Sequence, residues 1–117
     1  MKKEQIFMML FRFTPDFSHQ PSEGERAAMK QQWGSFIGNI AISEKLVSTY
    51  QLGFEGNVIQ ADLSVGDKVL IAEQQVVGGN MVVKANSMEE AATLAKDCPI
   101  LKMGGTVEIR SIIPMEH

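Results

Sequence analysis

The last third of the chain alternates strand-forming and helix-forming segments, with a turn signal at each junction. An apolar segment from Val76 to Ala85 predicts a strand, and Ser87 with Glu90 three residues later forms a capping box that begins an alanine-rich helix. Pro99 cannot continue that helix, so we expect it to end at Cys98. A closing strand follows over residues 107–113. This strand, helix, strand order constrains the fold more than any other feature.

The first third predicts a second unit of the same kind. Residues 5–13 are rich in strand formers, and Ser22 with Glu25 forms another capping box that begins a helix. Apolar residues of this helix recur at helical spacing and are expected to pack on a sheet: Met29, Trp33, Phe36, Ile37 and Ile40. Gly34 and Gly38 lie one turn apart, which predicts a close approach of backbone or a large side chain.

The middle of the chain predicts short strands separated by glycine turns. Residues 46–52 and 58–61 are strand candidates, and residues 68–72 are expected to form a further strand beside the preceding one. The whole order predicts one α+β domain over residues 1–117. We expect a ferredoxin-like antiparallel sheet with two helices on one face and an extra hairpin.

Both faces of the first strand are apolar. Phe7, Met9 and Phe11 alternate with apolar neighbours at positions 6, 8 and 10, yet the helices can cover only one face of the sheet. The second face therefore predicts a partner, and a two-fold homodimer is the commonest closed solution.

Composition excludes several classes of partner. The net charge of −3 includes no long Lys or Arg run, so neither nucleic acid nor an anionic membrane is expected to bind. Cys98 is the single cysteine, which rules out an internal disulfide and gives no cysteine metal motif, and no cofactor or metal is predicted. The apolar run at residues 6–11 is too short to span a membrane, and we expect a cytoplasmic protein.

Three residues are candidates for proton transfer. His19 could exchange a proton near neutral pH if a carboxylate oriented it, and Asp16 or Asp67 could supply that carboxylate. The alternative is a loop histidine that faces solvent or bonds to the backbone.

Four residues are candidates for binding a substrate. Arg12, at the end of an apolar strand, has a guanidinium suited to a carboxylate, and Arg110 shares a strand face with Glu108. For both arginines the alternative is a structural ion pair. Trp33 could form a flat wall for an organic ligand, although a Trp on an apolar helical stripe more often belongs to the core. Tyr50 could reach a cavity, and the equal alternative is a hydroxyl that bonds to the backbone.

Short motifs in this chain resemble the YCII-related family, and in particular its branch named for an Asp-Gly-Pro-Phe motif. They are the Val-Val-Gly-Gly sequence at residues 76–79, the Cys98-Pro99 helix stop and the Glu108-x-Arg110 strand. Where that branch reads Asp-Gly-Pro-Phe, this chain keeps only the aspartate, in Asp67-Lys68-Val69-Leu70, so the turn imposed by Gly and Pro is not expected here. The resemblance implies a dimeric α+β barrel with a cavity beside or within the interface.

Two hypotheses of function follow. The first is a small-molecule-binding protein or a cofactor-independent enzyme, in which the residues named above act on a small anionic or aromatic metabolite. The second is a non-catalytic dimeric module that binds or regulates a partner.

Overall fold

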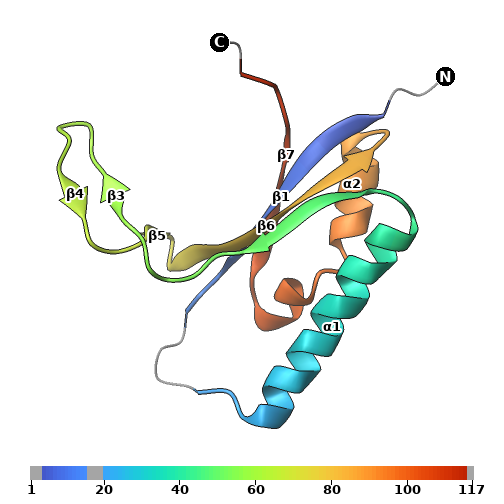
Figure 1. Cartoon of the computed structure of the whole chain (residues 1–117), viewed down its shortest axis with the longest axis horizontal. Coiled ribbons are helices and arrows are strands. Elements are labelled where there is room, and N and C mark those ends of the chain that lie inside the picture. Colours follow the sequence, from blue (N-terminus) through green and yellow to red (C-terminus); the bar gives the residue numbers. More distant parts are fainter. Residues whose placement is uncertain (1–3, 16–19, 116–117) are drawn as a thin grey trace.

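The computed structural model describes residues 4–15 and 20–115. Seven strands, two α-helices and one short 3₁₀ helix are found in these ranges (Figure 1). In chain order they are β1 (Gln5–Phe13), α1 (Glu23–Ile42), β2 (Leu46–Gln51), β3 (Val58–Ile59), β4 (Val65–Gly66), β5 (Ile71–Ala72), β6 (Gln75–Ala85), α2 (Met88–Ala95), η1 (Pro99–Met103) and β7 (Thr106–Ser111).

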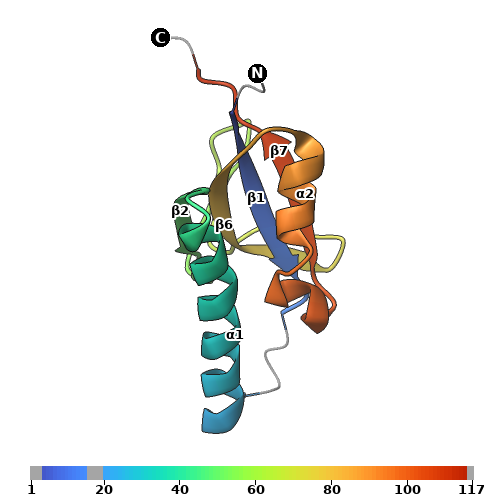
Figure 2. The ribbon, with the colours of Figure 1, turned by 90° about the vertical axis from the view of Figure 1, so that its right-hand side faces the viewer.

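The main sheet is antiparallel and has the strand order β2-β6-β1-β7. Strand β5 adds to it by pairing with the start of β6. Both α1 and α2 lie on the same side of this sheet (Figures 1 and 2). The predicted ferredoxin-like α+β fold is therefore confirmed, and the sheet is open rather than closed into a barrel.

The core lies between the sheet and the two helices. Phe7, Met9 and Phe11 of β1 are buried there, because alternate side chains of a strand point to one face. Met81 and Val83 of β6 bury beside them. Phe36 and Ile40 of α1 and Ala91 and Ala95 of α2 close the core from the helical side.

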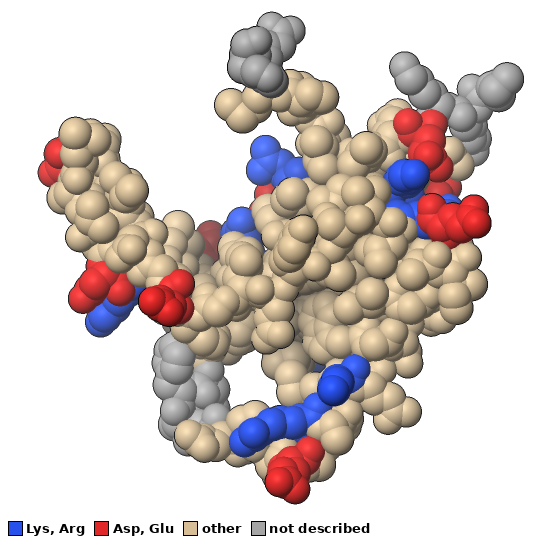
Figure 3. All heavy atoms as spheres, in the orientation of Figure 1, with Lys and Arg blue, Asp and Glu red and all other residues tan. Residues whose placement is uncertain are grey.

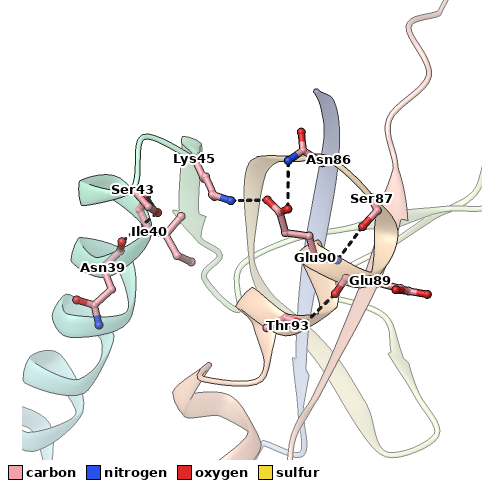
Figure 4. A network of polar contacts seen from close by, with 9 residues as sticks. All are labelled: Asn39, Ile40, Ser43, Lys45, Asn86, Ser87, Glu89, Glu90 and Thr93. Carbon is pink, nitrogen blue, oxygen red and sulfur yellow. Dashed lines mark hydrogen bonds and ion pairs between the residues drawn. The ribbon is translucent and has the colours of Figure 1, made fainter. Parts of the chain in front are cut away.

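A polar network fixes α2 against the turn that follows α1 (Figure 4). Lys45 Nζ donates to Glu90 Oε1, and Asn86 Nδ2 donates to Glu90 Oε2 at 3.3 Å. The Ser87 hydroxyl caps the helix by accepting from the Glu90 amide at 3.1 Å. The hydrogen bond from Lys45 lowers the pKa of Glu90, so this carboxylate is ionised and holds two segments together.

The middle of the chain pairs differently from the expectation. Strand β3 pairs with β4 as a separate two-stranded sheet, and β5 pairs with β6 instead of with β3 (Figure 1). The β3–β4 hairpin therefore stands apart from the main sheet. Strand β5 instead pairs with the free edge of β6 at residues 75–76. The prediction that residues 68–72 lie beside the preceding strand was wrong.

The second helix ends earlier than expected. It stops at Ala95, and Cys98 already has an extended backbone that caps η1. The 3₁₀ helix begins at Pro99, whose fixed φ suits the first position of a helix, and ends at Met103, where Gly104 caps it with a φ of 81°. It was not predicted.

Candidate functional site

A cleft of about 630 Å³ lies between α1, η1 and the adjoining ends of β1, β2 and β6. Its volume is within the range of small-molecule pockets, which is about 300–1,000 Å³. The lining is mostly apolar and comprises Phe11, Phe13, Arg26, Met29, Lys30, Trp33, Gly34, Ile37, Thr49, Tyr50, Gln51, Gly78, Gly79, Ile100 and Met103.

Aromatic side chains form the rigid part of the cleft. Trp33 packs edge-to-face on Phe11, with ring centroids 5.2 Å apart, and on Phe36 at 5.9 Å. Phe36 is buried, whereas Trp33 is partly exposed to the cleft. Edge-to-face pairs of this kind add about 0.5–1.5 kcal/mol beyond area burial, so the indole is held in a fixed orientation.

Two glycines of β6 let other elements approach the floor of the cleft. A Cβ at Gly78 would lie 2.4 Å from the Phe13 ring, and one at Gly79 would lie 2.7 Å from the Tyr50 carbonyl oxygen. Any larger residue would push Phe13 or β2 outward. The Gly78-Gly79 pair therefore sets the position of two of the cleft walls.

Two basic side chains of α1, Arg26 and Lys30, border the cleft. Arg26 Nε donates to the Pro21 carbonyl at 3.2 Å, and its terminal nitrogens have no hydrogen bond or ion pair to the described residues. Lys30 has no hydrogen bond or ion pair within the described residues. Figure 3 shows basic side chains beside the hollow next to the lower part of α1. The described lining residues carry these two positive charges and no carboxylate.

The glycines of α1 leave open space rather than a close contact. A Cβ built at Gly34 or at Gly38 would meet nothing within 4 Å, so the predicted close approach was wrong. Gly34 lines the cleft and Gly38 does not. Met29, expected to pack on the sheet, is 36% exposed and lines the cleft instead, because the first half of α1 extends beyond the sheet (Figures 1 and 2).

The candidate site residues fall into separate places. Trp33 and Tyr50 both line the cleft, and the Tyr50 side chain is largely exposed. Asp67 lies between β4 and β5, is exposed, and lines no part of the cleft. Asp16 and His19 lie outside the described residues, so their proposed partnership with Asp67 stays a prediction.

Arg12 and Arg110 lie on the sheet face opposite the helices. Arg12 Nη2 contacts Glu108 Oε1 at 2.9 Å, and Arg110 Nη1 donates to Glu108 Oε2 at 3.4 Å. This is the ion pairing that the sequence left open as an alternative for both arginines. Arg12 also borders a second hollow, of about 370 Å³, beside residues 69–70, and its buried Nε has no partner within the described residues.

Other chemistry is limited in the described part of the chain. Cys98 is 1% exposed, and burial raises the pKa of its thiol to about 11, so it is not a nucleophile at neutral pH. Within residues 4–15 and 20–115 no group of three or more His, Cys, Asp or Glu side chains could hold a metal ion. None of the described helices is both long and apolar enough to cross a bilayer.

Sequence reasoning missed the two basic residues at the cleft. Arg26, Lys30, Trp33 and Ile37 follow one another at spacings of four, three and four, which places them on one side of α1. That spacing was visible in the sequence. What the sequence could not show is that this side of the helix borders an open cleft.

The model of the YCII-related domain family matches residues 6–116, which is nearly the whole chain. No curated protein matches this chain.

Proposed function

Because this chain belongs to the YCII-related family, whose domain spans residues 6–116, we propose that it binds a small aromatic or apolar molecule with an anionic group. The ligand occupies the cleft between α1 and the sheet. The observation that carries the proposal is the union of an aromatic wall with two cations and no carboxylate among the described lining residues.

Each part of the ligand has a counterpart in the cleft. The indole of Trp33 and the ring of Phe13 stack against a flat apolar body, as aromatic side chains commonly do in pockets. The Arg26 guanidinium and the Lys30 ammonium bind the anionic group by charge-assisted hydrogen bonds. Such bonds contribute about 1.5–3 kcal/mol each.

Binding is the part of the function that the described cleft supports. Its described lining residues include no carboxylate, histidine or thiol that could act as a base or a nucleophile. Proton transfer by His19, with Asp16 or Asp67 as the orienting acid, therefore remains a separate prediction. If His19→Ala leaves the turnover of a bound compound unchanged, His19 has no catalytic role.

The test measures binding of 1-naphthoate and of its neutral methyl ester by calorimetry. We expect the anion to bind at least about tenfold more tightly than the ester, because only the anion uses the two cations. Lys30→Gln should weaken naphthoate binding about tenfold and leave ester binding unchanged. Equal affinities for the two compounds, or no binding of either, would contradict the proposal.

A matched pair of glycine variants locates the ligand. Gly34→Leu fills the cleft and should abolish naphthoate binding, whereas Gly38→Leu, one helical turn away and also in open space, should leave it intact. Both variants should keep the wild-type fold because a Cβ added at either position meets nothing within 4 Å. If both variants bind naphthoate normally, the ligand lies elsewhere.

A further inference from the structure

Helix α1 and strand β2 form two walls of the cleft. They are joined by the short turn at residues 43–45 and diverge from it, so the cleft opens between them (Figure 1). The helical wall carries the two cations, Arg26 and Lys30. The strand wall is the end of β2, with Thr49, Tyr50 and Gln51. This second wall is polar, and it has no counterpart in a ligand with only an aromatic body and one anionic group.

The pairing of β2 with β6 places the Gln51 side chain on the helix-facing side of the sheet. Thr49 pairs with Met81, and Gln51 pairs with Gly79. Met81 is fully buried between the sheet and the helices. Directly paired residues share a face of a sheet, and so do residues two apart on one strand. The Gln51 side chain therefore extends from the sheet toward the space beside α1.

Gly79 leaves the floor of the cleft bare next to Gln51. On β6 it lies between Phe11 of β1 and Gln51 of β2, and it pairs with both. A Cβ built at Gly79 would lie 3.5 Å from Phe11 Cδ2 and 3.6 Å from Gln51 Cα. Phe11 in turn holds the Trp33 ring at 5.2 Å. A flat ligand that rests on this floor beside the indole has Gln51 at its edge.

Gln51 is the polar side chain of the strand wall that can bind a ligand. Thr49 Oγ1 already donates to the Asn80 carbonyl at 3.0 Å. Tyr50 pairs with Asn80 and alternates with its two neighbours, so its ring points to the other side of the sheet. The Gln51 side chain is exposed and makes no hydrogen bond or ion pair within the described residues.

The chemistry of the glutamine amide limits what it binds. Its NH₂ group donates and its carbonyl oxygen accepts, so it pairs best with an uncharged group that also donates and accepts, such as a hydroxyl. An anionic group is bound more strongly by Arg26 and Lys30, because hydrogen bonds between charged groups are the stronger ones. The two walls therefore favour chemically different ends of one ligand.

The aromatic wall lies between these two ends. Along α1, Lys30 and Arg26 precede Trp33 by three and seven residues, which is about 4.5 Å and 10.5 Å of helix axis. They lie on the half of α1 that extends beyond the sheet, whereas Gln51 belongs to the sheet itself (Figure 1). A ligand held at both ends crosses the indole.

We propose that the cleft selects an aromatic acid that carries a second, uncharged polar substituent such as a hydroxyl, at the end away from its anionic group. Gln51 binds that substituent and is the specificity-determining residue for it. This inference rests on the function proposed above and narrows its ligand class.

The test compares derivatives of 1-naphthoate that carry either a hydroxyl or a methyl group, placed in turn at each free position of the second ring. The two groups are similar in size, so their comparison by calorimetry isolates the hydrogen bond. At one or more positions the hydroxyl should bind more tightly than the methyl. At the other positions the methyl should be preferred, because there the hydroxyl loses water without gaining a partner.

Gln51→Leu should remove the preference for the hydroxyl. At the preferred position, the ratio of hydroxyl to methyl affinity should fall about threefold to tenfold, which is the usual net effect of one neutral hydrogen bond. Gln32→Leu is the matched control, because Gln32 is an exposed glutamine of α1 that lines no part of the cleft. It should leave the ratio unchanged.

Three results would overturn the inference. In the first, no hydroxyl derivative binds more tightly than its methyl counterpart. In the second, Gln51→Leu leaves the ratio unchanged. In the third, Tyr50→Phe removes the preference instead, and the tyrosine hydroxyl then makes the contact. Each of these leaves binding of 1-naphthoate itself intact. If none of the compounds binds, the function proposed for the cleft fails as well, so the two failures are distinguishable.

Discussion

Helices α1 and α2 lie on the same face of one sheet but are packed in different ways. In the 8-residue α2, Ala91 and Ala95 are buried, and a hydrogen-bonded carboxylate fixes its first turn. In the 20-residue α1 only Phe36 and Ile40 are buried, and residues 23–32 are all exposed. The short helix stabilises the domain, whereas half of the long helix is available to a ligand.

The difference originates in side-chain size and spacing. The alanines of α2 allow its axis to approach the sheet closely, because ridges of small side chains leave little between the two surfaces. Trp33, Phe36 and Ile37 hold α1 further away and at one end only. The space that remains beside Gly34 is the cleft.

The largest expected effect comes from a comparison within α1. Phe36→Ala should lower the free energy of unfolding by about 3–5 kcal/mol, because it empties the aromatic cluster with Phe11 and Trp33. Met29→Ala, two turns earlier on the exposed half, should change it by less than about 0.5 kcal/mol. Urea denaturation of the two variants measures both values.

An equal loss of unfolding free energy in Phe36→Ala and Met29→Ala would mean that α1 is packed along its whole length. In that case the cleft would be a part of the core that a modest movement closes. The contrast between the two helices would then disappear.

A smaller effect of opposite sign is expected from the glycines of α1. Gly34→Ala and Gly38→Ala should each raise the free energy of unfolding by about 1 kcal/mol, because alanine favours a helix and its Cβ meets nothing within 4 Å. Thermal denaturation measures the change. Destabilisation by either variant would show that α1 lies closer to a neighbour than the structure places it.

The sequence predicted the architecture well where the patterns were long. The nine residues of β1 and the N-caps Ser22 and Ser87 gave the elements and their order, and burial of alternate residues followed from the strand period. Only the first cap is a full capping box, because the Glu90 carboxylate bonds to Lys45 and Asn86.

The short segments between β2 and β6 gave no such guide. By its sequence the Ile71-Ala72 strand could pair with the strand before it or with β6 after it. It pairs with β6 because the assembled sheet leaves an edge of β6 free there.

The candidate site was less predictable because its parts are joined only by the fold. Trp33 and Tyr50 come from different elements and line one cleft, whereas Arg12 and Arg110 lie on the opposite face with Glu108. In the sequence, nothing distinguishes Arg26 and Lys30 from other exposed residues of a helix. They border the cleft because α1 continues past the edge of the sheet.

The smallest effect concerns the network that holds α2, and it is visible as a dependence on pH. The pKa of Glu90 is lowered from its usual 4.5, chiefly by the hydrogen bond from Lys45. The unfolded chain therefore binds more protons than the folded chain as the pH falls below about 4.5. The stabilisation is fully present above that pH and is lost as the pH falls through the lower, folded-state pKa.

Glu90→Gln should accordingly flatten the fall in the free energy of unfolding below about pH 4.5, measured by urea denaturation at several pH values. Glu89→Gln is the control, because the Glu89 carboxylate points away from the network and only its main-chain oxygen bonds to Thr93 (Figure 4). If both variants keep the wild-type pH profile, the Lys45–Glu90 pair does not fix α2. The close packing of Ala91 and Ala95 would then be sufficient to distinguish the two helices.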